Sequence, residues 1–379
     1  MKTIYILLFL LFMTFQAYAT PQNTTCKKCH PVIFQEYQHS MHRKASIYQD
    51  PIHKAVWDKH PAKKKNNYKC AKCHTPSDHA LLEGKNKLTD NFIQENEPIS
   101  CQLCHTIKSI EKHATANKNI MTTKAKYFFS ADTAHKGEKV IFHEQSSLFG
   151  LIKKTVGSPY HDIDYSNENF YNGKMCMGCH SHKENAKGFA VCDMEVKQGG
   201  SKKSCISCHM PQVKGSLANQ KESQTHAFHG ISIHNGTPKL LSQYVKLSFK
   251  QTAKGFTVSI KNEANHTLFP QPLRLNQLRV SIERDGNTLT LPPRNFIRII
   301  GTEGKPSTPW LATEVLKDTT IKAHETRHVT FNTTLQKGDT VLIEFGYLLV
   351  NPKTAKKLHL DTPSATEFTV LTHQTVVVE

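Results

Sequence analysis

One five-residue pattern occurs five times in this chain, and it limits the possible folds more than any other feature. The pattern is C-x-x-C-H, and it uses ten of the eleven cysteines. The copies are Cys26-Lys27-Lys28-Cys29-His30, Cys70-Ala71-Lys72-Cys73-His74, Cys101-Gln102-Leu103-Cys104-His105, Cys176-Met177-Gly178-Cys179-His180 and Cys205-Ile206-Ser207-Cys208-His209. No cysteine follows Cys208. The chain therefore has a cysteine-rich part and a second part that folds without cysteines.

C-x-x-C-H is the pattern of c-type haem attachment. Two thiols at this spacing can each bond to one of the two vinyl groups of a haem, and the following imidazole can coordinate the iron. We therefore expect five covalently attached haem c groups, with the proximal iron ligands His30, His74, His105, His180 and His209. Structural zinc or disulfides are the alternatives for paired cysteines, but neither requires a histidine after every pair.

The eleventh cysteine, Cys192, has no partner left once the thioethers are made. We predict a buried thiol packed between the fourth and fifth haem units. A regulatory or ligand role is the alternative.

The N-terminus has the pattern of a secretory signal peptide over residues 1–19. Lys2 forms a short basic region, Ile4 to Phe15 is apolar, and Ala17-Tyr18-Ala19 is a small-x-small cleavage site. The expected mature chain begins near Thr20 and has no transmembrane segment. We expect export to the periplasm, with an extracellular or partner-held membrane location as variants and an uncleaved membrane anchor as the alternative.

The positions of the motifs predict two domains and a multidomain α+β fold. Residues 20–238 are expected to form a helical and loop-rich pentahaem domain, because the sequence between motifs has little continuous hydrophobic periodicity and the haems must supply the core. Helices are expected over Pro31 to Ile47 and His53 to Lys65, and a hairpin insertion over Lys126 to His143.

Residues 239–379 alternate apolar and polar side chains with a period of two. This pattern predicts an all-β domain, an immunoglobulin-like sandwich, with Asp285-Gly286 as a hairpin turn. The strands are expected around Val245 to Phe249, Phe256 to Ile260, Val280 to Ile282, Leu289 to Leu291, Phe296 to Ile300, Thr319 to Ala323, Arg327 to Thr334, Thr340 to Val350 and Thr366 to Val378.

Several short motifs outside C-x-x-C-H resemble those of the multihaem cytochromes c of the hydroxylamine-oxidoreductase-like and tetrahaem cytochrome group. They are Ser40-Met41-His42, Ser158-Pro159-Tyr160-His161, Cys192, Met210-Pro211, His226-Ala227-Phe228-His229-Gly230 and Asn265-His266-Thr267-Leu268-Phe269-Pro270. The last of these resembles an element that opens a β-domain appended to many such cytochromes.

The resemblance also bears on the second axial ligand of each iron. Thirteen histidines besides the proximal ones lie between residues 20 and 235, so supply exceeds need. The contexts of His42, His161 and His226 resemble those of distal ligands in the group. Further candidates are His79, His113, His229 and His234, with His266 as a weaker one from the β-domain.

Departures from the group limit the chemistry. Its pentahaem nitrite reductases carry one C-x-x-C-K motif, whereas all five motifs here end in histidine. Its hydroxylamine-oxidising members use eight haems. Both reactions are disfavoured, and no residue is assigned a catalytic role. An electron-transfer protein is favoured over an enzyme acting on a small nitrogen or sulfur compound at one five-coordinate haem, and over an assembly- or filament-forming cytochrome.

The chain is strongly basic, with 49 Lys and Arg against 31 Asp and Glu and a net charge of +18. Lysines lie beside several motifs: Lys27, Lys28, Lys63, Lys64, Lys65, Lys202 and Lys203. They predict docking of an acidic redox partner such as a cytochrome or a membrane quinol dehydrogenase; solvated lysines that neutralise haem propionates are the alternative. Nucleic acid is not an expected partner of an exported protein.

Overall fold

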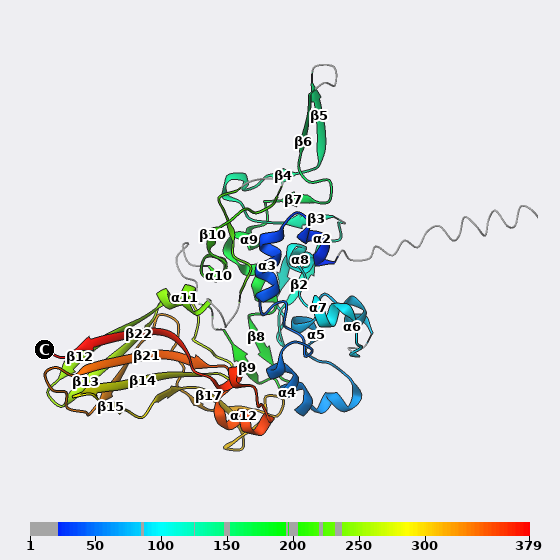
Figure 1. Cartoon of the computed structure of the whole chain (residues 1–379). Coiled ribbons are helices and arrows are strands. Elements are labelled where there is room, and N and C mark those ends of the chain that lie inside the picture. The colour runs from blue at the N-terminus through cyan, green and yellow to red at the C-terminus, as the bar shows by residue number, and fades with distance from the viewer. Residues whose placement is uncertain are drawn as a thin grey trace, which may run out of the picture.

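The computed structural model describes residues 22–84, 87–124, 126–147, 152–194, 196, 204–219, 223–231 and 237–379. The signal peptide, His234, Lys202 and Lys203 lie outside these residues. Figure 1 shows short helices and small hairpins in the first part of the chain and long strands in the second. The predicted fold class, a helical and loop-rich domain followed by an all-β domain, is confirmed.

The helices of the haem region, which we define as residues 22–231, are short. Asp50 begins one of them, because its carboxylate accepts hydrogen bonds from the Ile52 and His53 amides at 2.9 and 3.2 Å. The helices are α2 Asn23–Lys27, α3 Pro31–His39, α4 Pro51–Lys59, η1 Pro61–Lys65, α5 Ala71–His74, α6 His79–Glu83, α7 Phe92–Asn96, α8 Cys101–His105, η2 Thr133–His135, α9 Glu168–Asn172, η3 Lys174–Gly178 and α10 Cys205–His209. None of the helices in the described part of the chain has the length and hydrophobicity of a membrane span.

The helix predicted over Pro31 to Ile47, which is α3, is shorter than expected. It ends at His39 rather than near Ile47, because Ser40 is extended and its hydroxyl donates to the Tyr37 carbonyl at 2.7 Å. The same hydroxyl accepts from the Arg43 amide at 3.2 Å. Ser40 thus ends the helix, and residues 41–47 do not continue it.

Small sheets connect the helices of the haem region. Their strands are β1 Ile107–Glu111, β2 Lys118–Met121, β3 Tyr127–Phe129, β4 Lys139–Val140, β5 His143–Ser147, β6 Ile152–Val156, β7 Asp162–Asp164, β8 His182–Glu184, β9 Ala190–Asp193, β10 Gln212–Lys214 and β11 Thr225–Ala227. The hairpin predicted over Lys126 to His143 is wrong, because β7 lies between β3 and β4. The hairpin is instead β5–β6, which projects from the molecule in Figure 1.

The second part of the chain is a sandwich of two antiparallel sheets, with a small third sheet beside them. One sheet has the order β12 Val245–Thr252, β13 Gly255–Asn262 and β20 Thr326–Phe331. The other has the order β15 Asn287–Thr290, β14 Leu275–Arg284, β21 Thr340–Leu348 and β22 Thr369–Val377, with β16 Arg294–Phe296 also on β14. The third contains β17 Arg298–Thr302, β18 Lys305–Pro306 and β19 Glu314–Asp318. We call residues 245–379 the β-domain.

The predicted turn at Asp285-Gly286 joins β14 to β15, and both residues have positive φ, 49° and 75°, as a type I′ turn requires. Thr319 to Ala323, however, is not a strand. The Ile321 carbonyl there accepts hydrogen bonds from the Leu268 amide and the Asn262 side chain instead of a neighbouring strand. The remaining helices are α11 Thr237–Leu241, η4 Ser242–Tyr244, α12 Pro352–Leu358 and α13 Pro363–Thr366.

The β-domain packs directly on the haem region. Ile52 of α4 packs against the core of the β-domain. The Asn185 amide, after β8, donates to the carbonyls of Pro309 and Ala312 at 2.9 and 2.7 Å. The Trp310 ring meets His60 edge-on with centres 4.9 Å apart. These contacts hold the segment between β18 and β19, and the core beside Ile52, against the parts of the chain near the second and fourth motifs.

Candidate haem sites

Each motif forms one helical turn that brings its thiols and its histidine together. The His30, His74 and His180 amides donate to the carbonyl of the first cysteine of their motifs at 2.9, 3.0 and 2.9 Å. Serine side chains begin two of these turns: Ser100 accepts from the Leu103 amide and Ser204 from the Ser207 amide, both at 3.1 Å. The turn is the local structure that a covalent haem with one proximal ligand needs.

Backbone carbonyls orient three of the proximal imidazoles. The Nδ1 atoms of His30, His74 and His105 lie 2.8, 3.0 and 2.7 Å from the carbonyl oxygens of Leu217, Ala45 and Phe129. An Nδ1–H that donates to a carbonyl leaves Nε2 with its lone pair free for a metal. These three proximal rings are therefore held in the tautomer that an iron ligand requires.

Four of the five proximal histidines face a second histidine across a gap. The ring centres are 6.3 Å apart for His30 and His161, 6.1 Å for His180 and His42, 6.4 Å for His105 and His229, and 6.2 Å for His209 and His266. With metal–nitrogen bonds of about 2 Å and about 1.1 Å from nitrogen to ring centre, two imidazoles on one metal have centres about 6.2 Å apart. These pairs fit an iron between their rings.

The facing histidines come from distant parts of the chain. His42 follows α3, His161 precedes β7, His229 follows β11, and His266 belongs to the loop after β13 of the β-domain. The Nδ1 atoms of His229 and His266 lie 2.6 and 2.9 Å from the carbonyl oxygens of Ala227 and Thr267, which again leaves Nε2 for a metal.

Burial favours the neutral form of several of these imidazoles. Loss of solvent lowers the pKa of His42, His209 and His229 to about 4 in each case. The same cause lowers the pKa of His105 and His180. An imidazole coordinates a metal in its neutral form, so burial favours the form of these five histidines that can bind iron.

The second motif differs from the other four. Its histidine, His74, contacts His53, with ring centres 3.9 Å apart, which leaves no room for an iron between the rings. The Nδ1 atom of His53 lies 3.0 Å from the Ala45 carbonyl, as in the other histidines, but its Nε2 lies 3.2 Å from the Tyr68 hydroxyl, which engages the nitrogen that a metal would need. Among the described residues no second imidazole faces His74 at ligand distance.

Cysteines of different motifs lie side by side. Cys26 is next to Cys101, Cys73 next to Cys179, and Cys176 next to Cys205. Adjacent thiols that each carry a haem bring the edges of those haems together. The first motif is thereby joined to the third, and the fourth to both the second and the fifth.

His226, predicted as a distal ligand, does not face a motif histidine in the described structure. Its Nδ1 lies 3.0 Å from the Gly215 carbonyl, and its Nε2 lies 3.0 Å from the Glu36 carboxylate, so neither ring nitrogen is free. His229, three residues later, faces His105 instead. In the sequence, His229 is marked only by lying in the same family-like segment as His226. That segment does not show which of the two histidines faces a motif.

Two other candidates do not face a motif histidine. His79 is the exposed first residue of α6. His113 is exposed, and its Nδ1 accepts a hydrogen bond from the Thr115 amide at 3.3 Å. The described structure gives neither of them a proximal histidine to pair with, and both stay predictions.

Cys192 lies elsewhere than predicted. On β9 it is opposite Lys183 of β8, and the charges of Arg298 and Cys73 act on its thiol. It is therefore beside the second haem unit and the β-domain, not between the fourth and fifth units. Burial raises the pKa of this thiol.

The lysines beside the described motifs vary in their surroundings. Lys63 forms an ion pair with Asp58, and the Lys27 ammonium lies 5.4 Å from the centre of the Phe34 ring. Lys28, Lys64 and Lys65 are at the surface. Such lysines can attract an anionic partner, but only part of the predicted set is unengaged within the described structure.

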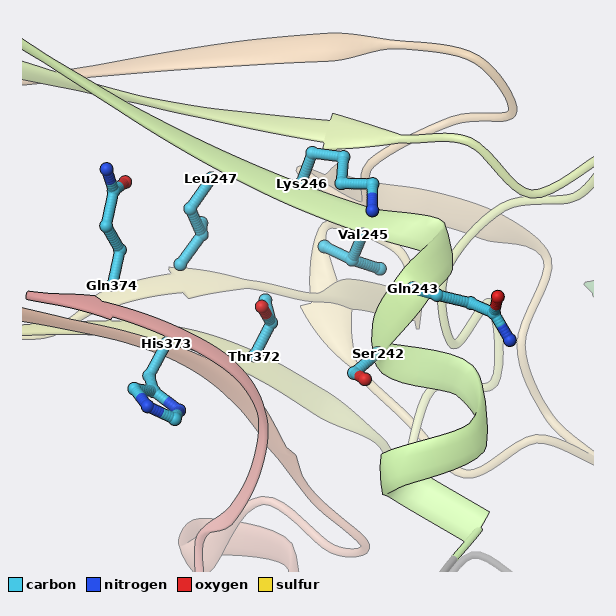
Figure 2. A pocket seen from close by; sticks show the side chains of 8 residues that line it. All are labelled: Ser242, Gln243, Val245, Lys246, Leu247, Thr372, His373 and Gln374. Carbon is cyan, nitrogen blue, oxygen red and sulfur yellow. The ribbon is translucent and has the colours of Figure 1, made fainter.

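A surface hollow lies in the β-domain between η4–β12 and β22, with residues of the two elements opposite each other in Figure 2. Its lining residues are Ser242, Gln243, Val245, Lys246, Leu247, Thr372, His373 and Gln374. None of them belongs to a motif or to one of the four histidine pairs. We assign the hollow no part in haem binding.

Comparison with known proteins places these motifs in a wider context. Residues 25–106, which include the first three motifs, match the family described as cytochrome c554 and c-prime. None of the curated proteins compared with the chain matches it. The fold is similar to that of a solved structure, a penta-heme cytochrome c552 from Thermochromatium tepidum, with a TM-score of 0.67 and 20% identity over 94% of this chain and 99% of that chain.

At 20% identity, the likeness to the penta-heme structure concerns the fold alone. The wider hydroxylamine-oxidoreductase-like group remains a resemblance carried by short motifs. Together, the family match, the shared fold and the five C-x-x-C-H motifs support a multihaem c-type cytochrome with covalently bound haem and an electron-transfer role.

Proposed function

We propose that this protein is an exported pentahaem cytochrome c that relays single electrons between a membrane quinol oxidase module or a small cytochrome and a terminal acceptor. The observation that carries the proposal is the set of four histidine pairs with ring centres 6.1 to 6.4 Å apart. An iron with two imidazole ligands has no position for a substrate and reorganises little on electron exchange. Four such irons favour electron transfer over catalysis.

Haem, when bound, supplies the one-electron ferric–ferrous couple, and the chain determines its ligands and spacing. The neighbouring cysteines connect the five haem units in one continuous series. Cys26 and Cys101 join the first and third units, and Cys104 of the third lies near Cys176 of the fourth. The fourth unit then meets the second and the fifth. Electrons would pass along this series, with the fourth unit as its branch point.

An acidic partner and a periplasmic location complete the proposal. The signal peptide pattern supports export, and the net charge of +18 supports attraction of an acidic cytochrome or quinol dehydrogenase. If the lysines steer this encounter, electron exchange slows steeply as salt rises, because exposed charges are screened within about 10 Å at 0.1 M ionic strength. Stopped-flow exchange rates that do not depend on salt would remove the lysines from the proposal.

The mass and spin state of the irons test the central claim. The exported protein is expected to have the mass of the chain from about Thr20 plus five haems, all of which survive acid–acetone extraction. His42→Ala and His161→Ala are each expected to retain five haems and to gain one high-spin iron. His79→Ala is the matched control, because His79 is exposed and faces no motif histidine.

The outcomes separate the parts of the proposal. Fewer than five haems, or stoichiometric zinc, would contradict the attachment at every motif. A spectrum of His42→Ala or His161→Ala identical to that of the wild type would show that the residue is not a ligand. A new high-spin signal in His79→Ala would mean that the spectrum reports general disturbance rather than ligand loss.

A second candidate function rests on the second motif, where His53 lies against His74 and no facing imidazole is described. We propose, as the alternative, a multihaem oxidoreductase in which this haem is five-coordinate and binds a small nitrogen or sulfur compound. One high-spin haem in the wild-type protein that rapidly binds cyanide, nitrite or sulfite would favour this function. Five low-spin haems that bind none of them would exclude it.

A further inference from the structure

Arg298, the first residue of β17, is a buried cation at the junction of the two domains. Only 8% of its surface is exposed. One guanidinium nitrogen, Nη2, donates to the Ala190 carbonyl of β9 at 2.9 Å. Its Nε is buried and has no hydrogen-bond partner, and no carboxylate pairs with Arg298, in the part of the chain that the structure describes. A donor and a full positive charge are thus left without an anion.

A buried guanidinium without a counter-ion is unfavourable unless an anion binds to it. A buried guanidinium loses its hydration, and one neutral carbonyl does not replace a counter-ion. The planar guanidinium instead matches an oxyanion that accepts two parallel N–H bonds, as a carboxylate does. The unfilled donor therefore indicates an anionic group that is not a side chain of the described protein.

The surroundings of Arg298 place this anion beside the second haem unit. The guanidinium binds β9 at Ala190, two residues from Cys192, and both Arg298 and Cys73 of the second motif lie near the Cys192 side chain. Lys183, opposite Cys192 in the β8–β9 pair, acts in turn on both Cys70 and Cys73. Arg298 and the second motif thus share the same few neighbours, although they belong to different domains.

Two sources can supply an oxyanion here: a propionate of the attached haem, or a small anion from solution. We propose that Arg298 binds a propionate carboxylate of the second haem, so that the β-domain fixes and tunes a cofactor attached to the other domain. The enclosure of Nε favours a group that is already tethered inside the junction over one that must enter from solvent. The inference rests on haem attachment at the second motif.

Reduction potentials of the full holoprotein test this assignment. Ferric haem carries one more positive charge than ferrous haem, so a nearby cation favours reduction. Arg298→Gln is therefore expected to lower the potential of one haem and to leave the other four unchanged. Arg298→Lys, which keeps the charge but not the fork, is expected to restore most of the shift.

The control is Arg284→Gln, which removes a guanidinium from the same domain. Arg284 pairs with Asp339 at the end of the sheet that lies away from the haem region in Figure 1. This variant is expected to leave all five potentials unchanged. Intact mass and far-ultraviolet circular dichroism establish that each variant carries five haems and a folded β-domain, so a failure of attachment is distinguished from a failure of the Arg298 assignment.

Three results would overturn the proposal. The first is a set of potentials in Arg298→Gln equal to those of the wild type. The second is an equal shift in Arg284→Gln. The third is a wild-type potential or spectrum that changes with added nitrite, sulfite or acetate and loses this dependence in Arg298→Gln, which would assign Arg298 to a solution anion. Insensitivity of the wild type to all three anions supports the tethered propionate.

Discussion

Twenty buried side chains form one cluster between the two sheets of the β-domain, whereas the largest cluster in the described haem region has four: Trp57, Tyr68, Ala71 and Leu81. The next cluster there has three, Tyr127, Phe129 and Phe170. A domain of the haem region's length cannot be stabilised by so few buried side chains. The β-domain is held together by its own residues, while the haem region relies on the groups attached to it.

The unpaired polar atoms follow the same division. Buried hydrogen-bonding atoms without a described partner in the haem region include Asn23 Nδ2, Ser46 Oγ, Thr75 Oγ1 and Ser181 Oγ. Buried polar groups in a complete structure are nearly always satisfied. Their number near the motifs fits a region whose remaining contacts are made by haem.

The largest expected difference between the regions appears when no haem is attached. Chain produced without haem attachment is expected to lose structure over residues 22–231 and to keep it over residues 245–379. Hydrogen exchange with mass spectrometry measures this directly, as rapid exchange in the first range and protection in the second. Equal protection of both ranges would show that side chains alone stabilise the haem region.

A cavity in the sandwich core is expected to have the next largest effect, and in the opposite region. Ile343 on β21 is fully buried between β14 and β22, so Ile343→Ala is expected to destabilise the β-domain by about 2–5 kcal/mol. Urea unfolding followed by far-ultraviolet circular dichroism measures this loss.

Leu289→Ala is the matched control, because Leu289 on β15 is 52% exposed and its truncation is expected to cost less than about 0.5 kcal/mol. If both variants lose the same stability, the core described here is not the source of the domain's stability.

A smaller effect is expected where the regions meet. His266→Ala removes the only facing imidazole that the β-domain supplies, opposite His209. The variant is expected to keep its covalent haems and an unchanged urea midpoint of the β-domain, while one iron becomes high-spin and binds cyanide. Loss of a haem from His266→Ala would mean instead that this residue acts in attachment.

The smallest effect concerns one ion pair of the β-domain, between the partly exposed Arg284 and the buried Asp339. Hydrogen bonds from Arg284 lower the pKa of Asp339 to about 2, below its ordinary 3.8. A lowered folded-state pKa stabilises the fold above the ordinary value, and this stabilisation is lost as pH falls from about 4 towards 2. The difference in melting temperature between wild type and Asp339→Asn is therefore expected to shrink over this range, and a constant difference would contradict the assignment.

Sequence patterns predicted local features better than distant contacts. The alternation of Val258 and Ile260 with polar residues predicted a strand, and β13 occupies that position. Thr319 to Ala323 has the composition of a strand, but Ile321 bonds to Leu268 and Asn262 through the tertiary fold. Propensity cannot show where a carbonyl finds its partner.

The same limit explains the candidate site. The covalent motifs are local patterns and could be read directly, while the choice between His226 and His229 depends on Glu36, which is 190 residues from His226 in the sequence. His53 gave no sequence signal for its contact with His74, since neither its neighbours nor its spacing resemble a ligand motif. A sequence alone does not reveal which of two neighbouring imidazoles will form a hydrogen bond with a distant carboxylate.

The pairing of remote histidines also determines the order in which the irons can gain their second ligand while the chain is being made. His30, His105 and His209 each face a histidine that is synthesised later than they are, whereas His180 faces the earlier His42. Three irons attached during export would thus pass through a stage with one reactive face until the later segment arrives. We expect an exported chain that stops before His161 to have a first iron that binds carbon monoxide, and the full-length chain to have lost that reactivity. The β-domain, emerging last, would close the fifth iron and end this exposed period.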